Sequence, residues 1–403
     1  MQIEHNAHLT YCTNIHPGES WEEVFASLQT YALQIKKKVA NNQAFGLGLR
    51  LSRRSAEELI QGKHLDQFKS WLENHNLYVF TMNGFPYGDF HHVAVKDQVH
   101  TPDWTTADRV VYTKSLVKIL AHLLPEGVEG GISTSPLSYK YWFNSEEQIE
   151  EVKNKAVLSL IAVVEELVQI KNQWGKTIHI DIEPEPDGVL ENTQEVISFY
   201  QDHLLKKGAE ALQEKLKCSQ SEAREHILEH LQVCYDVCHF SLAYEEPKEV
   251  MAQFREHGIK VGKIQISAAL KSRRSPEVSI KEQQDCLQQF DEPVYLHQAV
   301  VQKKDGMLDH YPDLQEGITA MGDENFQELR AHFHIPIFIP EFQVLESTQN
   351  DIVKALDLWK EGQYSTHLEV ETYTWTILPE HLQTDITSSI VRELQWVLNQ
   401  LEA

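Results

Sequence analysis

Hydrophobic positions in the first two thirds of the chain follow two alternating periods. Short apolar runs typical of strands are separated by longer segments in which apolar residues recur every three to four positions, as on one face of a helix. In segment 20–39 these positions are Trp21, Val24, Phe25, Leu28, Tyr31, Ala32 and Ile35. The strand-like runs are LTYCTN, FGLGLRL, LYVFTMNG, GGISTS, TIHIDIEPEP and LQVCYDVCHF. Capping-box patterns at Ser55–Glu58 and Ser145–Gln148 predict two helix starts.

This alternation predicts the fold class. Strands separated by helices pair in parallel through crossover connections, and eight such units close into an α/β (β/α)8 barrel, the TIM barrel. The competing fold is an open doubly wound sheet, in which GxGxxG follows the first strand. The glycines of GLGLR at 46–50 lie inside a predicted strand instead. The pattern therefore favours the barrel.

The last third contains more strand-like runs than a barrel needs. KIQISAAL, VYLHQAVV, HFHIPIFIPEF and HLEVETYTW all have strand character, which is two more than the remaining barrel positions. Two of these runs are expected to form an insertion or a rim hairpin, at roughly 263–325. No linker rich in Pro, Gly or Ser and no internal repeat divides the chain, so we predict one domain over 1–403.

Composition and charge limit the classes of partner. The formal net charge is −24, which argues against nucleic acid or an anionic membrane surface as a partner. The N-terminal segment lacks signal-peptide features, and no apolar run has the length of a membrane span, so no direct membrane insertion is expected. Five scattered cysteines without a CxxC pair suggest no disulfide framework. We expect a cytoplasmic protein.

Polar residues cluster at the ends of the predicted strands, where a parallel barrel forms its active site. The fifth strand ends in Glu183 and Glu185, and the sixth in Asp236 and His239. Two late strands carry His332 with His334 and Glu369 with Glu371. Weaker candidates are Asn14 with His16, Asn83, His91 with His92, and His297. Carboxylates with imidazoles suit Mn, Zn, Co or Fe(II), so a divalent metal ion of unassigned identity is expected.

These stretches resemble the xylose isomerase-like TIM barrels, a superfamily of sugar isomerases, epimerases and endonuclease-IV-type enzymes. The matching stretches are IEPEP at 182–186, DVCH at 236–239, HFH at 332–334 and VETY at 370–373. The resemblance implies a metal held by Glu183, Asp236, His334 and Glu371. It also implies that Glu183 and Glu371 act as acid and base. His239 and His332 would orient the substrate, and the further candidates for contact with it are Asn14, His16, His91, Gln265 and His297.

A second resemblance covers nearly the whole chain. HLTYCTNIHPGESW, MNGFPYGDFH, PDWTTADRVVYT, ISTSPLSYK, KIQISAAL, YLHQ and HLEVETYTWTILP are similar to the family called metabolite traffic protein EboE. This resemblance implies membership of a gene set that makes or moves a secondary-metabolite precursor. The partners it implies are a small-molecule metabolite and other proteins of the same gene cluster.

Two assignments stay open. Either HFH is barrel strand seven and KIQIS with YLHQ forms the insertion, which we favour, or Gln265 and His297 replace the usual ligand. As the metal ligand on the last strand, we prefer Glu371 to Glu369, because Glu371 resembles the glutamate that precedes an aromatic residue in related barrels.

The function we predict is that of a metal-dependent isomerase or epimerase of a small polyhydroxylated or hydroxycarbonyl compound. One alternative is a carrier protein that binds a metabolite without turnover. The second alternative is an endonuclease-like phosphodiesterase, which the negative net charge of the chain disfavours.

Overall fold

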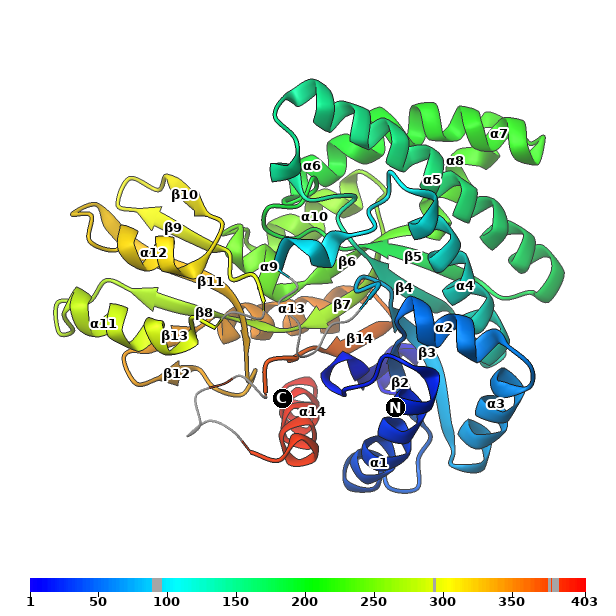
Figure 1. The fold of residues 1–403 in the computed structure, drawn as a ribbon, viewed down its shortest axis with the longest axis horizontal. Helices are drawn as coiled ribbons and strands as arrows, with labels where there is room; N and C mark the ends of the chain where they lie inside the picture. Colours follow the sequence, from blue (N-terminus) through cyan, green and yellow to red (C-terminus); the bar gives the residue numbers. More distant parts are fainter. Residues whose placement is uncertain (89–95, 293–294, 376–377, 379–383) are drawn as a thin grey trace.

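Eight parallel strands form the central sheet of the computed structural model, which describes residues 1–88, 96–292, 295–375, 378 and 384–403. The sheet order is β1-β14-β7-β6-β5-β4-β3-β2, and a parallel bridge between Cys12 and Gly48 joins its two edges. The strands are β1 (His8–Tyr11), β2 (Phe45–Arg50), β3 (Leu77–Asn83), β4 (Gly130–Thr134), β5 (Ile178–Ile182), β6 (Leu231–Asp236), β7 (Val261–Ile266) and β14 (His367–Val370). The predicted TIM barrel is confirmed (Figure 1).

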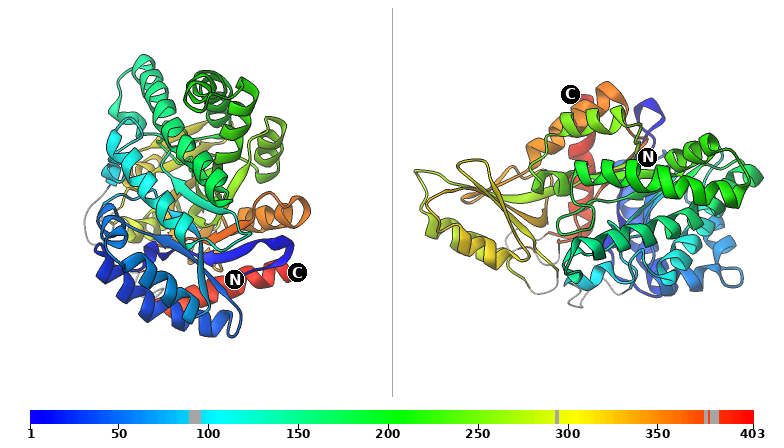
Figure 2. Two further views of the ribbon diagram at one scale, coloured as in Figure 1. Left: turned by 90° about the vertical axis from the view of Figure 1, so that its right-hand side faces the viewer. Right: turned by 90° about the horizontal axis from the view of Figure 1, so that it is seen from above.

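Helices surround this barrel on its outer face (Figures 1 and 2). They are α1 (Trp21–Val39), α2 (Arg53–Ile60), α3 (His64–Asn74), α4 (Ala107–Leu123), α5 (Glu146–Trp174), α6 (Thr193–Ser198) with a π-helical continuation (Phe199–Gly208), α7 (Ala209–Leu216), α8 (Gln220–His230), α9 (Val237–Leu242), α10 (Pro247–Glu256), α13 (Gln349–Gly362) and α14 (Ile386–Glu402). Short 3₁₀ helices lie at Glu4–Asn6, Thr13–Ile15, Lys96–His100, Lys140–Trp142 and Gln288–Phe290. In the described part of the chain, no helix has the length and apolarity needed to cross a membrane.

Local sequence signals account for most helix ends. Ser145 caps α5 by accepting a hydrogen bond from the Gln148 N–H, and Gly175 ends this helix in a left-handed conformation. The prediction at Ser55 is wrong by a few residues, because α2 begins at Arg53 and Ser52 is its cap. The carboxylate of Glu58 accepts the backbone N–H of Trp21 instead, at 2.7 Å, and so ties α2 to the start of α1.

A second, antiparallel sheet lies beside the barrel, on the left in Figure 1. Its strand order is β10-β9-β11-β8-β13-β12. The strands are β8 (Ala268–Arg273), β9 (Ala299–Lys303), β10 (Leu308–Tyr311), β11 (Phe326–Ile335), β12 (Glu341–Phe342) and β13 (Leu345–Ser347), with helices α11 (Ile280–Leu287) and α12 (Leu314–Ala320). We call this unit the extra sheet.

The extra sheet corrects our assignment of barrel strand seven. KIQI belongs to β7, which pairs with β6 and β14 inside the barrel, whereas HFH belongs to β11 of the extra sheet. The favoured alternative is therefore wrong, and the segment outside the barrel starts after β7 and extends beyond residue 325 to Ser347. Both strands are apolar and buried, so their pattern alone did not show which sheet each joins. That residues 1–403 form one domain stays a prediction.

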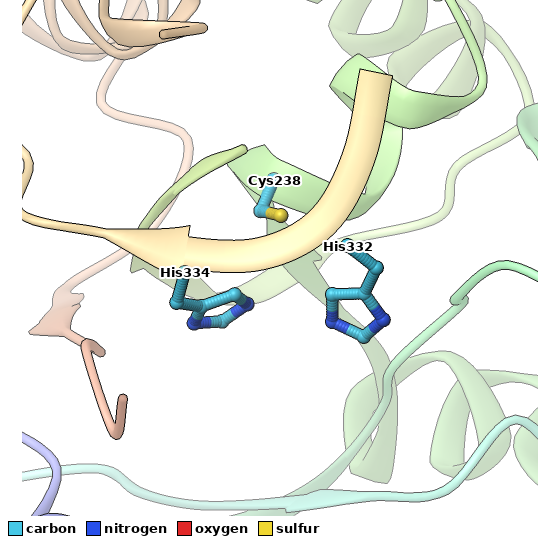
Figure 3. A group of neighbouring side chains, drawn as sticks. All are labelled: Cys238, His332 and His334. Atoms are coloured by element: carbon cyan, nitrogen blue, oxygen red, sulfur yellow. The ribbon is translucent and has the colours of Figure 1, made fainter. Parts of the chain in front are cut away.

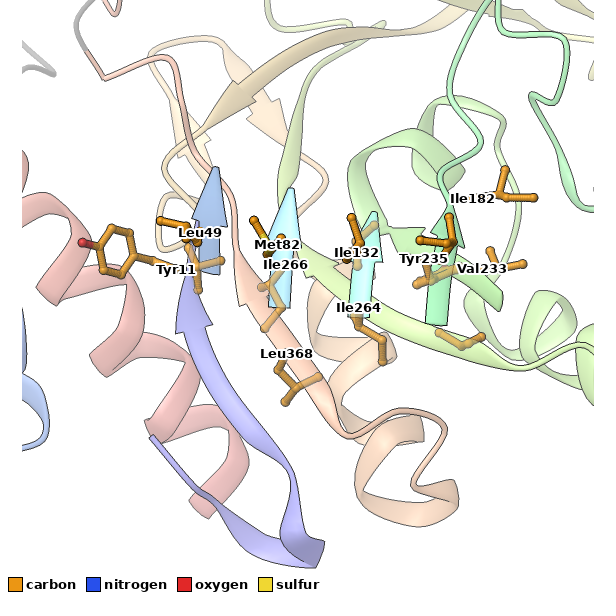
Figure 4. Packing of buried hydrophobic residues seen from close by; sticks show 14 of the residues in the cluster. Tyr11, Leu49, Met82, Ile132, Ile182, Val233, Tyr235, Ile264, Ile266 and Leu368 are labelled. Carbon is orange, nitrogen blue, oxygen red and sulfur yellow. The ribbon is translucent and has the colours of Figure 1, made fainter. Parts of the chain in front are cut away.

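The core lies between the barrel strands and the helices. Leu49 of β2, Met82 of β3, Ile132 of β4 and Ile264 of β7 are among the fully buried residues (Figure 4). Inside the barrel, charged pairs replace apolar side chains: Lys263 Nζ lies 2.7 Å from Glu369 Oε2. Gly48 leaves the space that this pair needs, because a Cβ atom there would lie 1.6 Å from Glu369 Oε1.

A buried carboxyl on the last helix is expected to make stability depend on pH. Glu393 of α14 accepts hydrogen bonds from Thr372 Oγ1 at 2.7 Å and from the Ile337 N–H at 3.2 Å. Burial raises the pKa of Glu393 to about 7. Because the folded state favours the protonated form, this contribution to stability is present below the unfolded-state pKa and is lost as the pH rises through about 7.

The measurement is the unfolding free energy in denaturant at pH 5 and pH 8 for the wild type and for Glu393→Gln. The wild type should lose on the order of 3 kcal/mol more than the variant over this range. An equal change in both proteins would contradict the role of Glu393.

Candidate metal centre

Four neighbouring strands deliver polar side chains to the carboxyl-terminal end of the barrel. Glu183 directly follows β5, Asp236 ends β6, Gln265 lies in β7, and Glu371 directly follows β14. Register brings them together, because Asp236 pairs with Gln265 across β6 and β7, and the Glu371 N–H bonds to the Ile266 carbonyl at 3.1 Å. Parallel strands end at one edge of the sheet, so residues far apart in sequence meet there.

We define the carboxylate trio as Glu183, Asp236 and Glu371. One carboxylate oxygen of each lies within 4.8 Å of the others, and all three side chains are buried. The Gln265 amide Nε2 lies among them, 3.3 Å from Glu183 Oε1 and 3.2 Å from Asp236 Oδ2, and it also donates to Glu371 Oε2. The trio is thus a dense negative cluster with a single amide group at its centre.

Surrounding donors fix the orientation of two members of the trio. The amide groups of Asn14 and Asn83 donate to Glu371 Oε1 at 2.7 and 2.9 Å. Ser267 Oγ donates to Asp236 Oδ1 at 2.6 Å, and the His239 N–H donates to the same oxygen at 3.2 Å, because Asp236 is the N-cap of α9. The carboxylates are therefore held with oxygens directed at one another.

The electrostatics of the trio favour a cation. Burial and the neighbouring Glu371 and Asp236 carboxylates raise the pKa of Glu183 well above its usual range. Burial and Asp236 raise the pKa of Glu371 to about 8. Glu183 Oε2 is buried and has no hydrogen-bond partner among the described residues. Like charges this close need a proton or a metal ion between them.

A second group, the imidazole trio, lies beside the carboxylates and consists of His239, His332 and His334. His332 and His334 project from the same side of β11, with Cys238 of α9 nearby (Figure 3). His334 Nδ1 donates to the Glu371 carbonyl at 2.9 Å, and His239 Nδ1 donates to the Pro184 carbonyl at 3.0 Å. The extra sheet thus brings two imidazoles to the end of the barrel.

Burial keeps the imidazoles neutral. It lowers the pKa of His239 and of His332 well below the usual value, and neighbouring imidazoles add to the effect. Burial also lowers the pKa of His334, whose Nε2 has no partner among the described residues. Neutral imidazole is the form that binds metal ions.

Members of both trios line one cavity. Asp236 lies beneath it, while Glu183, Glu371 and the three imidazoles line it. Aromatic side chains, including Phe85, Tyr295 and Tyr373, form much of the remaining wall. Lys96 is the cationic lining residue in the described part of the chain, and it pairs with Asp313 at 2.6 Å.

The structure places four predicted residues away from the cavity wall. His16 is not among the lining residues, because its Nε2 bonds to the Tyr11 hydroxyl at 2.9 Å and its ring stacks on Tyr31. His297 is also behind the wall: its Nδ1 bonds to the His332 carbonyl and its Nε2 to Glu292. Gln265 lies under the cavity within the carboxylate trio, and Glu369 pairs with Lys263 inside the barrel.

The other predicted residues fall into two sets. Asn14, Asn83, His239 and His332 line the cavity, and their contact with a substrate stays a prediction. The prediction for His91, and that for His92, lies outside the described residues.

Sequence reasoning missed several residues of the site. Gln298 and His100 line the cavity, and Gln298 Oε1 lies 2.8 Å from His332 Nδ1. Gln298 belongs to the YLHQ stretch, of which only His297 was named as a candidate. The signal for His100 was weak, because it ends a short 3₁₀ helix between β3 and α4 and does not follow a strand.

No protein-family model and no curated protein matches the sequence. Among solved structures, a xylose isomerase-like TIM barrel protein from Mycobacterium smegmatis in complex with magnesium has a TM-score of 0.50 at 11% identity, over 100% of this chain and 98% of that chain. A xylose isomerase domain protein from Alicyclobacillus acidocaldarius subsp. acidocaldarius has a TM-score of 0.46 at 10% identity, over 98% of both chains. The IOLI protein with a bound zinc atom has a TM-score of 0.46 at 13% identity, also over 98% of both chains.

The fold of this chain is thus that of the xylose isomerase-like TIM barrels. The narrower resemblance to the EboE family stays a prediction.

Proposed function

We propose that this xylose isomerase-like barrel is a divalent-metal-dependent isomerase or epimerase that acts on a small polyhydroxylated or hydroxycarbonyl metabolite. The observation that supports this proposal is the carboxylate trio, in which three buried acidic groups from separate strand ends lie within 4.8 Å of one another at the cavity. Burying three carboxylates together is costly unless a cation compensates them.

The residues present fit a divalent ion. Glu183, Asp236 and Glu371 supply oxygen ligands, and His334 supplies a nitrogen from the adjacent group that it forms with Asp236. The buried Glu183 Oε2 and His334 Nε2, both without a partner among the described residues, are the atoms that such an ion would satisfy. The ion supplies Lewis-acid stabilisation of the negative charge that develops on substrate oxygens when a C–H proton leaves. The solved structure from M. smegmatis with this fold holds magnesium.

Glu183 and Glu371 are placed to move the proton. They project from β5 and β14, so they reach the cavity from different strands of the barrel. In the metal-free protein, burial and Asp236 raise the pKa of Glu371 to about 8, so this carboxyl group can hold a proton near neutral pH. We assign one glutamate to proton removal and the other to proton return, with His239 and His332 orienting the substrate.

The cavity favours an uncharged substrate. Lys96, the cationic lining residue of the described part, is already paired with Asp313. Phosphate recognition in proteins uses clustered Arg or Lys, so neither a nucleic acid backbone nor a phosphorylated sugar suits this wall. The resemblance to the EboE family leads us to seek the substrate among secondary-metabolite precursors.

The turnover test uses the metal-loaded protein in deuterated water with small hydroxyketones such as dihydroxyacetone and D-fructose. We expect deuterium to enter the carbon next to the carbonyl, and Glu183→Gln to reduce this rate by about 10²-fold or more. Glu361→Gln, on the exposed face of α13, is the matched control. Bound metal and bound ligand without any exchange would instead support the carrier hypothesis.

Metal content tests the ligand set directly. Asp236→Ala should contain less divalent metal than the wild type after identical loading and desalting, because it removes one carboxylate of the trio. Asp285→Ala, at an exposed position of α11, should retain the wild-type content. Equal content in Asp236→Ala and the wild type would remove Asp236 from the ligand set.

A further inference from the structure

We propose that helix α8, among the outer helices of the barrel (Figure 1), carries a separate zinc-binding site formed by His226, Glu229 and His230. One ligand atom of each side chain lies within 4.8 Å of the others. This inference goes beyond the proposed function, because the site lies apart from the carboxylate trio. His230 directly precedes β6, whereas Asp236 is the last residue of this strand of six residues. At about 3.3 Å per residue, His230 and Asp236 lie roughly 20 Å apart along the chain.

The sequence of α8 places two imidazoles on one side of the helix. His226 and His230 follow each other at i and i+4, and side chains at this spacing lie one turn apart on the same face. With Glu229 between them, the stretch HILEH has the order His-x-x-Glu-His. Two histidines at this spacing bind zinc in the helical motifs of metalloproteases. Spacing alone is a weak signal, so the surroundings of each group are decisive.

His230 is fully buried and has one ring nitrogen available to an ion. Its Nδ1 lies 2.7 Å from the Ile178 carbonyl, which can only accept, so Nδ1 carries the hydrogen. Burial lowers the pKa of His230 to about 4, so the ring is neutral near pH 7. Its Nε2 is buried and has no hydrogen-bond partner among the described residues. Histidines that bind metal ions commonly donate their other N–H to a backbone carbonyl in this way.

The carboxylate of Glu229 faces the lone pair of this imidazole. Glu229 Oε2 lies 3.4 Å from His230 Nε2, while Glu229 Oε1 accepts a hydrogen bond from the Lys171 ammonium group of α5. A nitrogen lone pair opposite a carboxylate oxygen is unfavourable unless a proton or a metal ion lies between them, and burial disfavours the proton. In a tetrahedral zinc site with Zn–N and Zn–O distances of about 2.0–2.2 Å, two ligand atoms lie about 3.4 Å apart. The observed separation fits an ion at this position.

His226 completes the set from the solvent side. His226 and Glu229 are only half-buried, so an ion can reach the site from outside the barrel. Two imidazoles with one carboxylate suit zinc better than magnesium or calcium, which prefer oxygen ligands. Glu229 and His230 are the last two residues of α8, where the negative end of the helix dipole also favours a cation. The bound ion would fasten the last turn of α8 where this helix leads into β6.

The first experiment is equilibrium dialysis of the full chain against micromolar Zn²⁺, followed by metal analysis. His226→Ala should lose most of one equivalent of zinc, both in the otherwise unchanged chain and in the Asp236→Ala background. His257→Ala, at an exposed position that follows α10, is the matched control and should keep the content of its parent. Equal zinc content with and without His226→Ala would overturn the site. A loss through His226→Ala but none through Asp236→Ala would support the α8 site and count against the carboxylate trio.

The second experiment measures amide hydrogen exchange in a peptide that covers residues 220–231, and it is decisive in the wild type alone. Saturating Zn²⁺ should slow exchange in the last turn of α8, because the ion opposes local opening of the helix end. His257→Ala should show the same slowing, and His226→Ala should show much less. Exchange that zinc leaves unchanged in the wild type would overturn the site. This peptide contains no residue of the carboxylate trio, so the two proposals can fail separately.

Discussion

Replacing Glu371 with glutamine is expected to stabilise the metal-free protein and to reduce its stabilisation by added metal ions. In the wild type, the raised pKa of Glu371, about 8, means that the folded state favours the protonated form. Stability from this group is present below the unfolded-state pKa and is lost as the pH rises through about 8. Glutamine removes this penalty because it carries no charge beside Glu183 and Asp236. It also removes one oxygen ligand of the proposed ion.

The two effects have opposite signs, which makes the experiment specific. Unfolding in denaturant at pH 9 should show the metal-free variant to be more stable than the metal-free wild type. A metal concentration about 1,000 times the dissociation constant should stabilise the wild type by about 4 kcal/mol, through binding to the folded state alone. The variant should gain far less at the same concentration. The account is contradicted if Glu371→Gln gains as much stability from metal as the wild type and the control Glu361→Gln.

Replacing Lys263 with methionine is expected to destabilise the barrel by about 3–5 kcal/mol. Lys263 and Glu369 are both fully buried, and their ion pair is 2.7 Å long. Lys263 Nζ also lies 3.3 Å from the Met82 carbonyl and 3.4 Å from Ser133 Oγ. Without the ammonium group, the Glu369 carboxylate would remain buried and uncompensated, with Gly48 packed against it.

The double variant Lys263→Met/Glu369→Gln separates the effect of buried charge on stability from the effect of side-chain packing. It should recover most of the lost stability, since the remaining side chains are neutral and close to the original shapes. Lys281→Met, at an exposed position of α11, should change the free energy of unfolding by less than about 0.5 kcal/mol. The account is wrong if Lys263→Met is as stable as the wild type, or if the double variant is no more stable than Lys263→Met. In either case, an uncompensated Glu369 charge would not be the cause of instability.

Much of the barrel could be predicted from local patterns. The first six strands were found from their apolar runs, because parallel strands covered on both faces are nearly continuous in hydrophobic residues. The pairing of β7 was missed because membership of a sheet depends on long-range contacts. KIQI and HFH have similar local character, yet one lies in the barrel and the other in the extra sheet.

The candidate site was predictable where residues directly follow strands. Glu183, Asp236 and Glu371 converge because strand order fixes where strand ends meet. Gln265 was predicted to contact the substrate or to replace a metal ligand, and its place at the centre of the trio depends on the register of β7 against β6 and β14. His16 and His297 were misjudged because their hydrogen-bond partners, Tyr11 and Glu292, turn them away from the cavity.

Histidine tautomers are a property that no sequence pattern reveals. The hydrogen positions on His239 and His332 follow from the Pro184 carbonyl and the Gln298 amide, and Gln298 is separated from His332 in sequence by β9, β10 and α12. This is why the resemblance implied only a general role in substrate contact for both histidines.

Anomalous scattering from crystals of the Zn²⁺-loaded protein, with data collected on both sides of the zinc absorption edge, tests the central claim most directly. We expect a zinc peak bounded by Glu183, Asp236 and Glu371, about 2.0–2.2 Å from the ligating oxygens, with the Gln265 amide group displaced from its present position. The absence of a peak at this position, with Gln265 still bonded to the three carboxylates at full zinc loading, would contradict the claim.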